Sequence, residues 1–209
     1  MFLLSLLPLG FKVSPLFPSG IAELAFVLVF FLWFYFEIIN QVYIAFRNKG
    51  SSIKIKNDKF SLFGIYFGTI MILYITSWFN GNAPSYNLPL WAFYLGLAMM
   101  IFGEGLRQWS TVTLGRFFTA AVIITNDHKL IIRGPYKFFR HPAYIGGTIA
   151  IVGISVAVRS WGAALIALAI MLLVYAYRIH FEEQALRKEF GRTYADYAKK
   201  TPIIIPRVF

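Results

Sequence analysis

The residues with the clearest chemical potential lie in a segment that begins at Arg133 and reads RGPYKFFRHPAYIGG. Gly134 and Pro135 form a turn signal, and Pro142 suits the first position of a helix, where its missing N–H needs no partner. His141 would then be the N-cap of that helix. Such a helix start presents unpaired backbone N–H groups and the positive end of a dipole, which favour a carboxylate or phosphate. The same composition is also typical of a basic, aromatic anchor at a membrane interface.

A second group of polar residues follows near the end of the chain, within RIHFEEQALR. On a helix, Arg178 and Glu182 share a face because they are four residues apart, and Glu183 pairs with Arg187 in the same way. Two adjacent carboxylates point in different directions, so we expect one to face a site and the other to face solvent. The spacing does not decide whether Glu182 or Glu183 faces inward. Ordinary salt bridging within one helix explains the pattern equally well.

Other candidates are weaker. Four polar or aromatic residues follow the apolar segment 88–102 and could line a site, although a solvated helix end has the same composition. They are Glu104, Arg107, Gln108 and Trp109. His128 is a candidate catalytic residue, although the residues around it, 126–129, are equally typical of a plain turn. Three histidines, no cysteine and no ligand spacing indicate no metal site, and no glycine-rich nucleotide loop follows a strand.

The elements that position these residues must be membrane helices. Of the 209 residues, 58% are apolar and 14% are charged, and the mean hydropathy is +0.65. One crossing of a hydrocarbon core needs about 20 apolar residues, so the chain has room for crossings and short loops but not for a separate soluble domain. The net charge of +11 comes from short runs between apolar segments, which indicates the positive-inside pattern rather than nucleic-acid binding.

The predicted fold is an all-α, polytopic membrane protein with about five transmembrane helices. The basic runs place the N-terminus outside, and the active site and C-terminus in the cytoplasm. The first ten residues are interpreted as an uncleaved interfacial segment. Two regions are expected, residues 1–103 and a catalytic region 104–209, whose tail is amphipathic and lies on the membrane or folds back on the loop before it. The expected spans are residues 21–46, 60–79, 88–102, 143–158 and 161–177.

Two motifs taken together resemble a known family. The first motif is GPYKFFRHPAYIGG, and the second, about 40 residues later, is EEQALRKEFGRTYADYAKKTPIIIP. The pair is similar to the isoprenylcysteine carboxyl methyltransferase family and to the related phospholipid N-methyltransferases. The resemblance covers roughly residues 114 to 206. It implies S-adenosylmethionine as the cofactor, bound at the cytoplasmic face by the loop, the helix start and a glutamate of the double-glutamate motif.

The resemblance also assigns residues. Arg178 matches the arginine that the family places near the reacting carboxylate, and Arg178 and Glu182 are the expected catalytic pair. A family glutamine that precedes the equivalent of His128 has no match here. The expected cofactor residues are His128, Lys129, Leu130, Ile131, Tyr136, His141, Pro142, Ala143, Tyr144 and Glu182.

The implied activity is methylation of the carboxylate of a lipid-tailed, prenylcysteine-like substrate. Three alternatives stay open: a phospholipid or amine N-methyltransferase, a sterol-reductase-like enzyme that uses NADPH, and a non-catalytic relative. The expected partners are a lipid-tailed or prenylated substrate and membrane lipids, with no nucleic acid. The sequence indicates neither the acceptor nor the oligomeric state.

Overall fold

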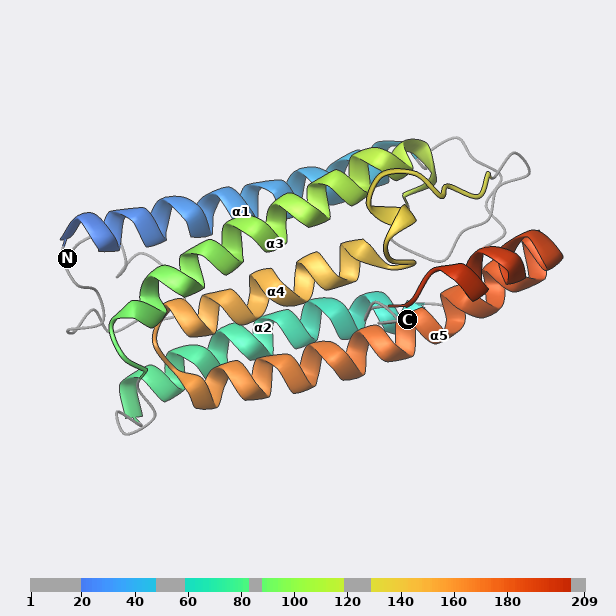
Figure 1. Ribbon diagram of the computed structural model, residues 1–209. Coiled ribbons are helices and arrows are strands. Elements are labelled where there is room, and N and C mark those ends of the chain that lie inside the picture. Colours follow the sequence, from blue (N-terminus) through green and yellow to red (C-terminus); the bar gives the residue numbers. More distant parts are fainter. Residues whose placement is uncertain (1–19, 48–58, 83–87, 119–128, 204–209) are drawn as a thin grey trace.

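The computed structural model describes residues 20–47, 59–82, 88–118 and 129–203. Within these ranges the secondary structure is helical, and each of the five predicted spans falls on one α-helix (Figure 1). The expectation of an all-α fold is confirmed. His128 and the predicted interfacial segment at the N-terminus lie outside the described residues. The helices are α1 (Gly20–Arg47), α2 (Lys59–Asn82), α3 (Trp91–Leu114), η4 (Gly115–Phe117), η5 (Gly134–Lys137), α4 (Pro142–Ala157) and α5 (Trp161–Lys200).

The five α-helices run roughly along one direction, with α4 between α3 on one side and the α2–α5 pair on the other (Figure 1). Helix α1 packs on α3. Helix α5 is longer than the others, and its C-terminal part extends past the end of the bundle. The start of α4 and the point at which α5 leaves the bundle lie at this same end.

The closest packing in the bundle is between α3 and α4, where glycines let the two backbones touch. A Cβ atom on Gly146 would lie 2.5 Å from the carbonyl oxygen of Gly103 and 2.7 Å from the backbone nitrogen of Arg107. A Cβ atom on Gly103 would lie 2.6 Å from the carbonyl oxygen of Gly146. Gly96 and Gly153 repeat this contact farther along the pair. We call these four glycines the α3–α4 seam, which is typical of helices that associate in lipid.

Helix α3 is longer than the sequence predicted. The expected span ended at residue 102, and the polar residues after Phe102 were expected to leave the helix, but α3 continues to Leu114. Glu104 and Arg107 are both buried. These polar residues therefore do not end the helix, because they face the interior of the bundle rather than water.

A three-residue turn, Val158 to Ser160, joins α4 to α5, so the two helices form an antiparallel hairpin. Ser160 is the N-cap of α5, and its hydroxyl accepts a hydrogen bond from the N–H of Ala163 at 3.3 Å. Arg159 adopts a φ of 64°. Its backbone carbonyl and its side chain both bond the backbone of Leu88, at 2.5 and 2.8 Å, so the turn is tied to the chain before α3.

The outside of the bundle is apolar. Side chains such as Leu28 on α1, Ile70 on α2, Phe102 on α3 and Leu173 on α5 are more than half exposed. Residues 20–40 and α5 each contain a stretch long and apolar enough to cross a membrane, and residues 64–79 and 142–157 form shorter apolar helices. Large exposed apolar surfaces suit lipid rather than water. The number of crossings and their orientation stay predictions.

The seam makes a prediction about stability. Gly146→Ala should lower the free energy of unfolding by about 1–3 kcal/mol, because the added methyl group forces the α3 backbone away. Gly105→Ala is the matched control, since a Cβ atom there meets nothing within 4 Å and alanine favours the helix by up to about 1 kcal/mol. Thermal unfolding in detergent measures both, and equal stability of the two variants would contradict the seam.

Candidate active site

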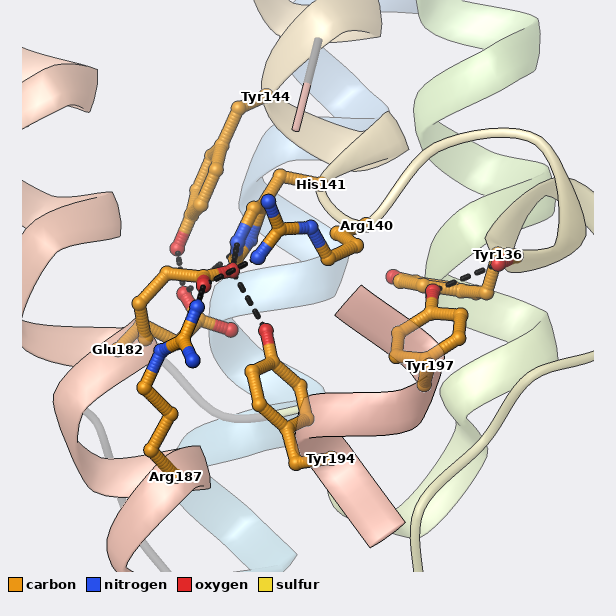
Figure 2. Close-up of polar contacts among 9 residues, drawn as sticks. Tyr136, Arg140, His141, Tyr144, Glu182, Arg187, Tyr194 and Tyr197 are labelled. Carbon is orange, nitrogen blue, oxygen red and sulfur yellow. Dashed lines mark hydrogen bonds and ion pairs between the residues drawn. The ribbon is translucent and has the colours of Figure 1, made fainter. Parts of the chain in front are cut away.

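The candidate site is built around the start of α4. His141 is the N-cap residue and Pro142 occupies the first turn, as predicted. The imidazole of His141 does not cap its own helix; it is only 2% exposed and points toward α5 (Figure 2). The amide of Ala143 therefore has neither an acceptor within the helix nor a capping side chain at this helix start.

Three side chains from α4 and α5 form a chain of hydrogen bonds. The guanidinium of Arg178 donates through Nε to the hydroxyl of Tyr144 at 2.5 Å. That hydroxyl donates in turn to Oε2 of Glu182 at 2.7 Å. Tyr144 thus bridges the arginine and the glutamate that the sequence placed on one face of a helix. The second carboxyl oxygen of Glu182, Oε1, accepts no hydrogen bond from the described residues.

Aromatic packing fixes the ring of Tyr144. The ring of His141 stacks on it with centroids 5.8 Å apart, and the ring of Tyr175 lies 4.7 Å away on α5. The guanidinium carbon of Arg178 lies 5.8 Å from the centroid of the same ring. The structure therefore brings together four residues expected from the sequence. Sequence reasoning missed Tyr175, since it is one of many aromatic residues inside an apolar span.

Glu183 is the centre of a second, more buried cluster. Its carboxylate accepts from Arg140, from Nε2 of His141 at 2.9 Å and from the hydroxyl of Tyr194 at 2.5 Å. Arg187 lies 3.6 Å away at the position four residues later, and Figure 2 shows these side chains converging from the loop and from α5. Burial alone would raise the pKa of Glu183, but the hydrogen bonds from His141 and Tyr194 and the nearby charges hold this pKa below its ordinary value.

The two adjacent glutamates correct one expectation. We expected one carboxylate to face solvent, but the side chain of Glu182 is 28% exposed and that of Glu183 is 12% exposed. Both point inward, toward different partners. The loop and the C-terminal part of α5 engage both carboxyl oxygens of Glu183, whereas Oε1 of Glu182 accepts no hydrogen bond from the described residues.

The C-terminal part of α5 folds back on the loop before α4, one of the two predicted courses for the tail. Gly191 makes this possible with a φ of 49° and a ψ of −119°, a backbone conformation that glycine tolerates best. The hydroxyl of Tyr197 donates to the backbone carbonyl of Tyr136 at 2.6 Å, and the N–H of Arg140 donates to the carbonyl of Pro202 at 2.9 Å. Burial raises the pKa of Tyr197 to about 12, so its hydroxyl stays a donor at neutral pH.

An ion pair reaches the site from α3 and α1. Nη2 of Arg107 donates a hydrogen bond to Oε2 of Glu37 at 2.9 Å, and Nε lies 2.5 Å from Oε1 as an ion-pair contact without hydrogen-bond geometry. Its third nitrogen, Nη1, donates to the carbonyl of Ala143 at 3.4 Å. Arg107 was one of the weaker candidates in the sequence, and Glu37 was not among the candidates. Nothing in the sequence pattern of α1 indicates that Glu37 pairs with an arginine seventy residues later in the chain.

The remaining expected residues are placed differently. Lys129, Leu130 and Ile131 lie in irregular chain before η5 and join none of the hydrogen bonds or ion pairs of the site. Tyr136 contributes its backbone carbonyl to the contact with Tyr197, and its ring is buried. Pro142 is buried in the first turn of α4.

The arrangement suits a zwitterionic ligand. The amide of Ala143 at a helix N-terminus can bind a carboxylate, and Oε1 of Glu182 can accept from an ammonium group. Arg178 donates a hydrogen bond to the hydroxyl of Tyr144, which bonds the same glutamate. These donors and acceptors fit an amino-acid-like group next to an anion that Arg178 holds.

The Glu183 cluster predicts a pH effect. Because the pKa of Glu183 is lower in the folded protein, its ionised form adds stability above the ordinary value of 4.5 and loses it as the pH falls through the folded value. Glu183→Gln should therefore cost about 2–4 kcal/mol at neutral pH and cost less as the pH drops below 4.5. Unfolding of both proteins across this pH range measures the difference. A constant difference would contradict the role given to the carboxylate.

Comparison with known proteins agrees with the resemblance seen in the sequence. Residues 96–188 match the model of the isoprenylcysteine carboxyl methyltransferase (ICMT) family. The protein-S-isoprenylcysteine O-methyltransferase B of Arabidopsis thaliana is 38% identical over 127 residues, which is 60% of this chain and 64% of the relative. The Homo sapiens protein-S-isoprenylcysteine O-methyltransferase is 31% identical over 128 residues, which is 59% of this chain and 44% of the relative.

A solved structure has the same fold. The structure of the eukaryotic intramembrane Ras methyltransferase ICMT matches with a TM-score of 0.57 and 25% sequence identity, over 74% of this chain and 55% of that chain. In each of these comparisons the match spans less than two thirds of the other protein. The family model, the relatives and the solved structure agree, and this chain is therefore related to the isoprenylcysteine carboxyl methyltransferase family.

Proposed function

We propose that this chain is an integral membrane methyltransferase that uses S-adenosylmethionine to methylate the carboxylate of a lipid-tailed, prenylcysteine-like acceptor. The observation that carries the proposal is the Arg178–Tyr144–Glu182 chain of hydrogen bonds at the start of α4. The names of the relatives, all isoprenylcysteine O-methyltransferases, support the same reaction.

The cofactor would be held by groups of this chain that suit its amino-acid part. The helix start at Ala143 receives the carboxylate, and Glu182 accepts from the ammonium group while Tyr144 orients it. When bound, S-adenosylmethionine supplies an electrophilic methyl group on a sulfonium sulfur. The protein contributes position and a site from which water is excluded.

An anionic acceptor fits the charge of this site. Arg178 would orient the acceptor carboxylate toward the methyl group that bound S-adenosylmethionine would supply, with the sulfur as the leaving group. No proton is released, so no base is needed. An amine acceptor must lose a proton, and Nε2 of His141 is already engaged by Glu183. This engagement favours a carboxylate over an amine.

The location of the site suits an acceptor with a lipid tail. The site lies at the end of a bundle whose exterior is apolar, and the clusters around it carry arginines and tyrosines. We infer that this end faces the cytoplasm, because the described basic residues of the loop before α4 and of the C-terminal part of α5 gather here. The tail of the acceptor would stay in lipid while its carboxylate reaches Arg178.

The direct test is transfer of a labelled methyl group by the protein in detergent or vesicles. We expect label from S-adenosylmethionine on prenylcysteine carboxylates, and none on phosphatidylethanolamine. Calorimetry with NADPH should show no binding. Label on the phospholipid amine instead would replace the carboxylate acceptor, and tight NADPH binding without S-adenosylmethionine binding would overturn the methyltransferase proposal.

A variant of Glu182 tests the cofactor contact. Glu182→Gln should weaken S-adenosylmethionine binding by tenfold or more, about 1.4 kcal/mol or above, because the amide lacks the charge that holds the ammonium group. Glu189→Gln is the matched control, since Glu189 is an exposed glutamate on the same helix. Calorimetry gives both affinities. Unchanged affinity in Glu182→Gln would remove the role that we give to this residue.

A further inference from the structure

Helix α1 contributes to the site through one ion pair. Among the described contacts, Glu37 is the residue of α1 that meets the guanidinium of Arg107: one carboxyl oxygen accepts a hydrogen bond from Nη2, and the other forms an ion-pair contact with Nε. Arg107 is 8% exposed. Helix α1 lies outside the region that matches the family model, so the match itself assigns Glu37 no role.

The guanidinium of Arg107 lies against the first turn of α4. Its Nη1 donates to the carbonyl of Ala143 at 3.4 Å. A Cβ atom on Gly147 would lie 3.4 Å from the same nitrogen and 2.7 Å from the hydroxyl of Tyr175. The guanidinium of Arg107 therefore contacts the first turn of α4 through Nη1, while Nη2 and Nε contact Glu37 on α1.

The ion pair is not explained by stability. A buried ion pair costs desolvation of both charges, and apolar residues of similar volume serve a helix interface as well or better. Ionisable groups that face the interior of a membrane bundle usually belong to a functional site. A two-pronged contact between a carboxylate and an arginine fixes the direction of the guanidinium as well as its position.

We propose that Glu37 is a positioning residue for the site: by holding Arg107, it fixes the first turn of α4 and the amide of Ala143 in the geometry that binds the cofactor. The part of this inference that concerns cofactor affinity rests on the function proposed above. The part that concerns the order of the helix start does not.

The test measures the free protein first. Hydrogen exchange reports the free energy of local opening, and Glu37→Gln should speed the exchange of amides 143–147 by about tenfold, which corresponds to about 1.4 kcal/mol less resistance to opening. Glu37→Asp, which keeps the charge, should restore part of the protection. In an Arg107→Met background, Glu37→Gln should have no further effect, because Glu37 acts through Arg107.

Thr76→Val is the matched control. It removes another buried contact between helices, the 2.8 Å hydrogen bond between Thr76 on α2 and Ser155 near the far end of α4. We expect it to lower the melting temperature without changing exchange at 143–147. Its affinity for S-adenosylmethionine should stay within twofold of the wild type, whereas Glu37→Gln should weaken binding by about tenfold.

The outcomes separate the two proposals. If Glu37→Gln lowers the melting temperature as the control does but leaves exchange at 143–147 and cofactor affinity within twofold, the pair is only structural and the inference is wrong. If the wild type binds no S-adenosylmethionine, the proposed function fails. The exchange measurements then decide the role of Glu37 by themselves.

Discussion

The rest of the structure depends on the direct contact between the backbones of α3 and α4. Because Gly103 and Gly146 carry no side chain, the carbonyl of one helix lies against the other helix at this point. This contact brings the backbone of Arg107 beside Gly146 and its guanidinium beside Ala143. Two sets of contacts therefore hold the site at the start of α4. One is the packing of α3 against α4, and the other is the contact of α4 and the loop before it with α5.

The parts of the site that rest on local signals could be predicted from the sequence. Pro142 after His141 indicates a helix start on its own, since few residues suit the first helical position so well. The spacing of Arg178 and Glu182 places them on one face of any helix. Their link through Tyr144 needed only that α4 and α5 be antiparallel neighbours, which the short turn between Ala157 and Trp161 requires.

The parts that rest on distant partners could not be predicted. The direction of Glu183 depends on Arg140 and His141, more than forty residues earlier, and on Tyr194 after the kink. On an isolated helix, one of two adjacent carboxylates is expected to face solvent. Here both Glu182 and Glu183 point inward, because each has its own hydrogen-bond partners on other parts of the chain. The length of α3 was missed for a related reason, since a buried partner for Arg107 lies on α1 and leaves no mark in the sequence of α3.

The return of the chain at Gly191 also has a consequence for biosynthesis. A ribosome makes the chain from the N-terminus onward, so α1 to α4 and the membrane part of α5 emerge before Tyr197 and Pro202. The contacts of Tyr197 with Tyr136 and of Pro202 with Arg140 close the loop before α4 only after those last residues appear. The residues that close the site are therefore made later than the helices that carry it, so the site stays open until the C-terminal part of α5 has been synthesised.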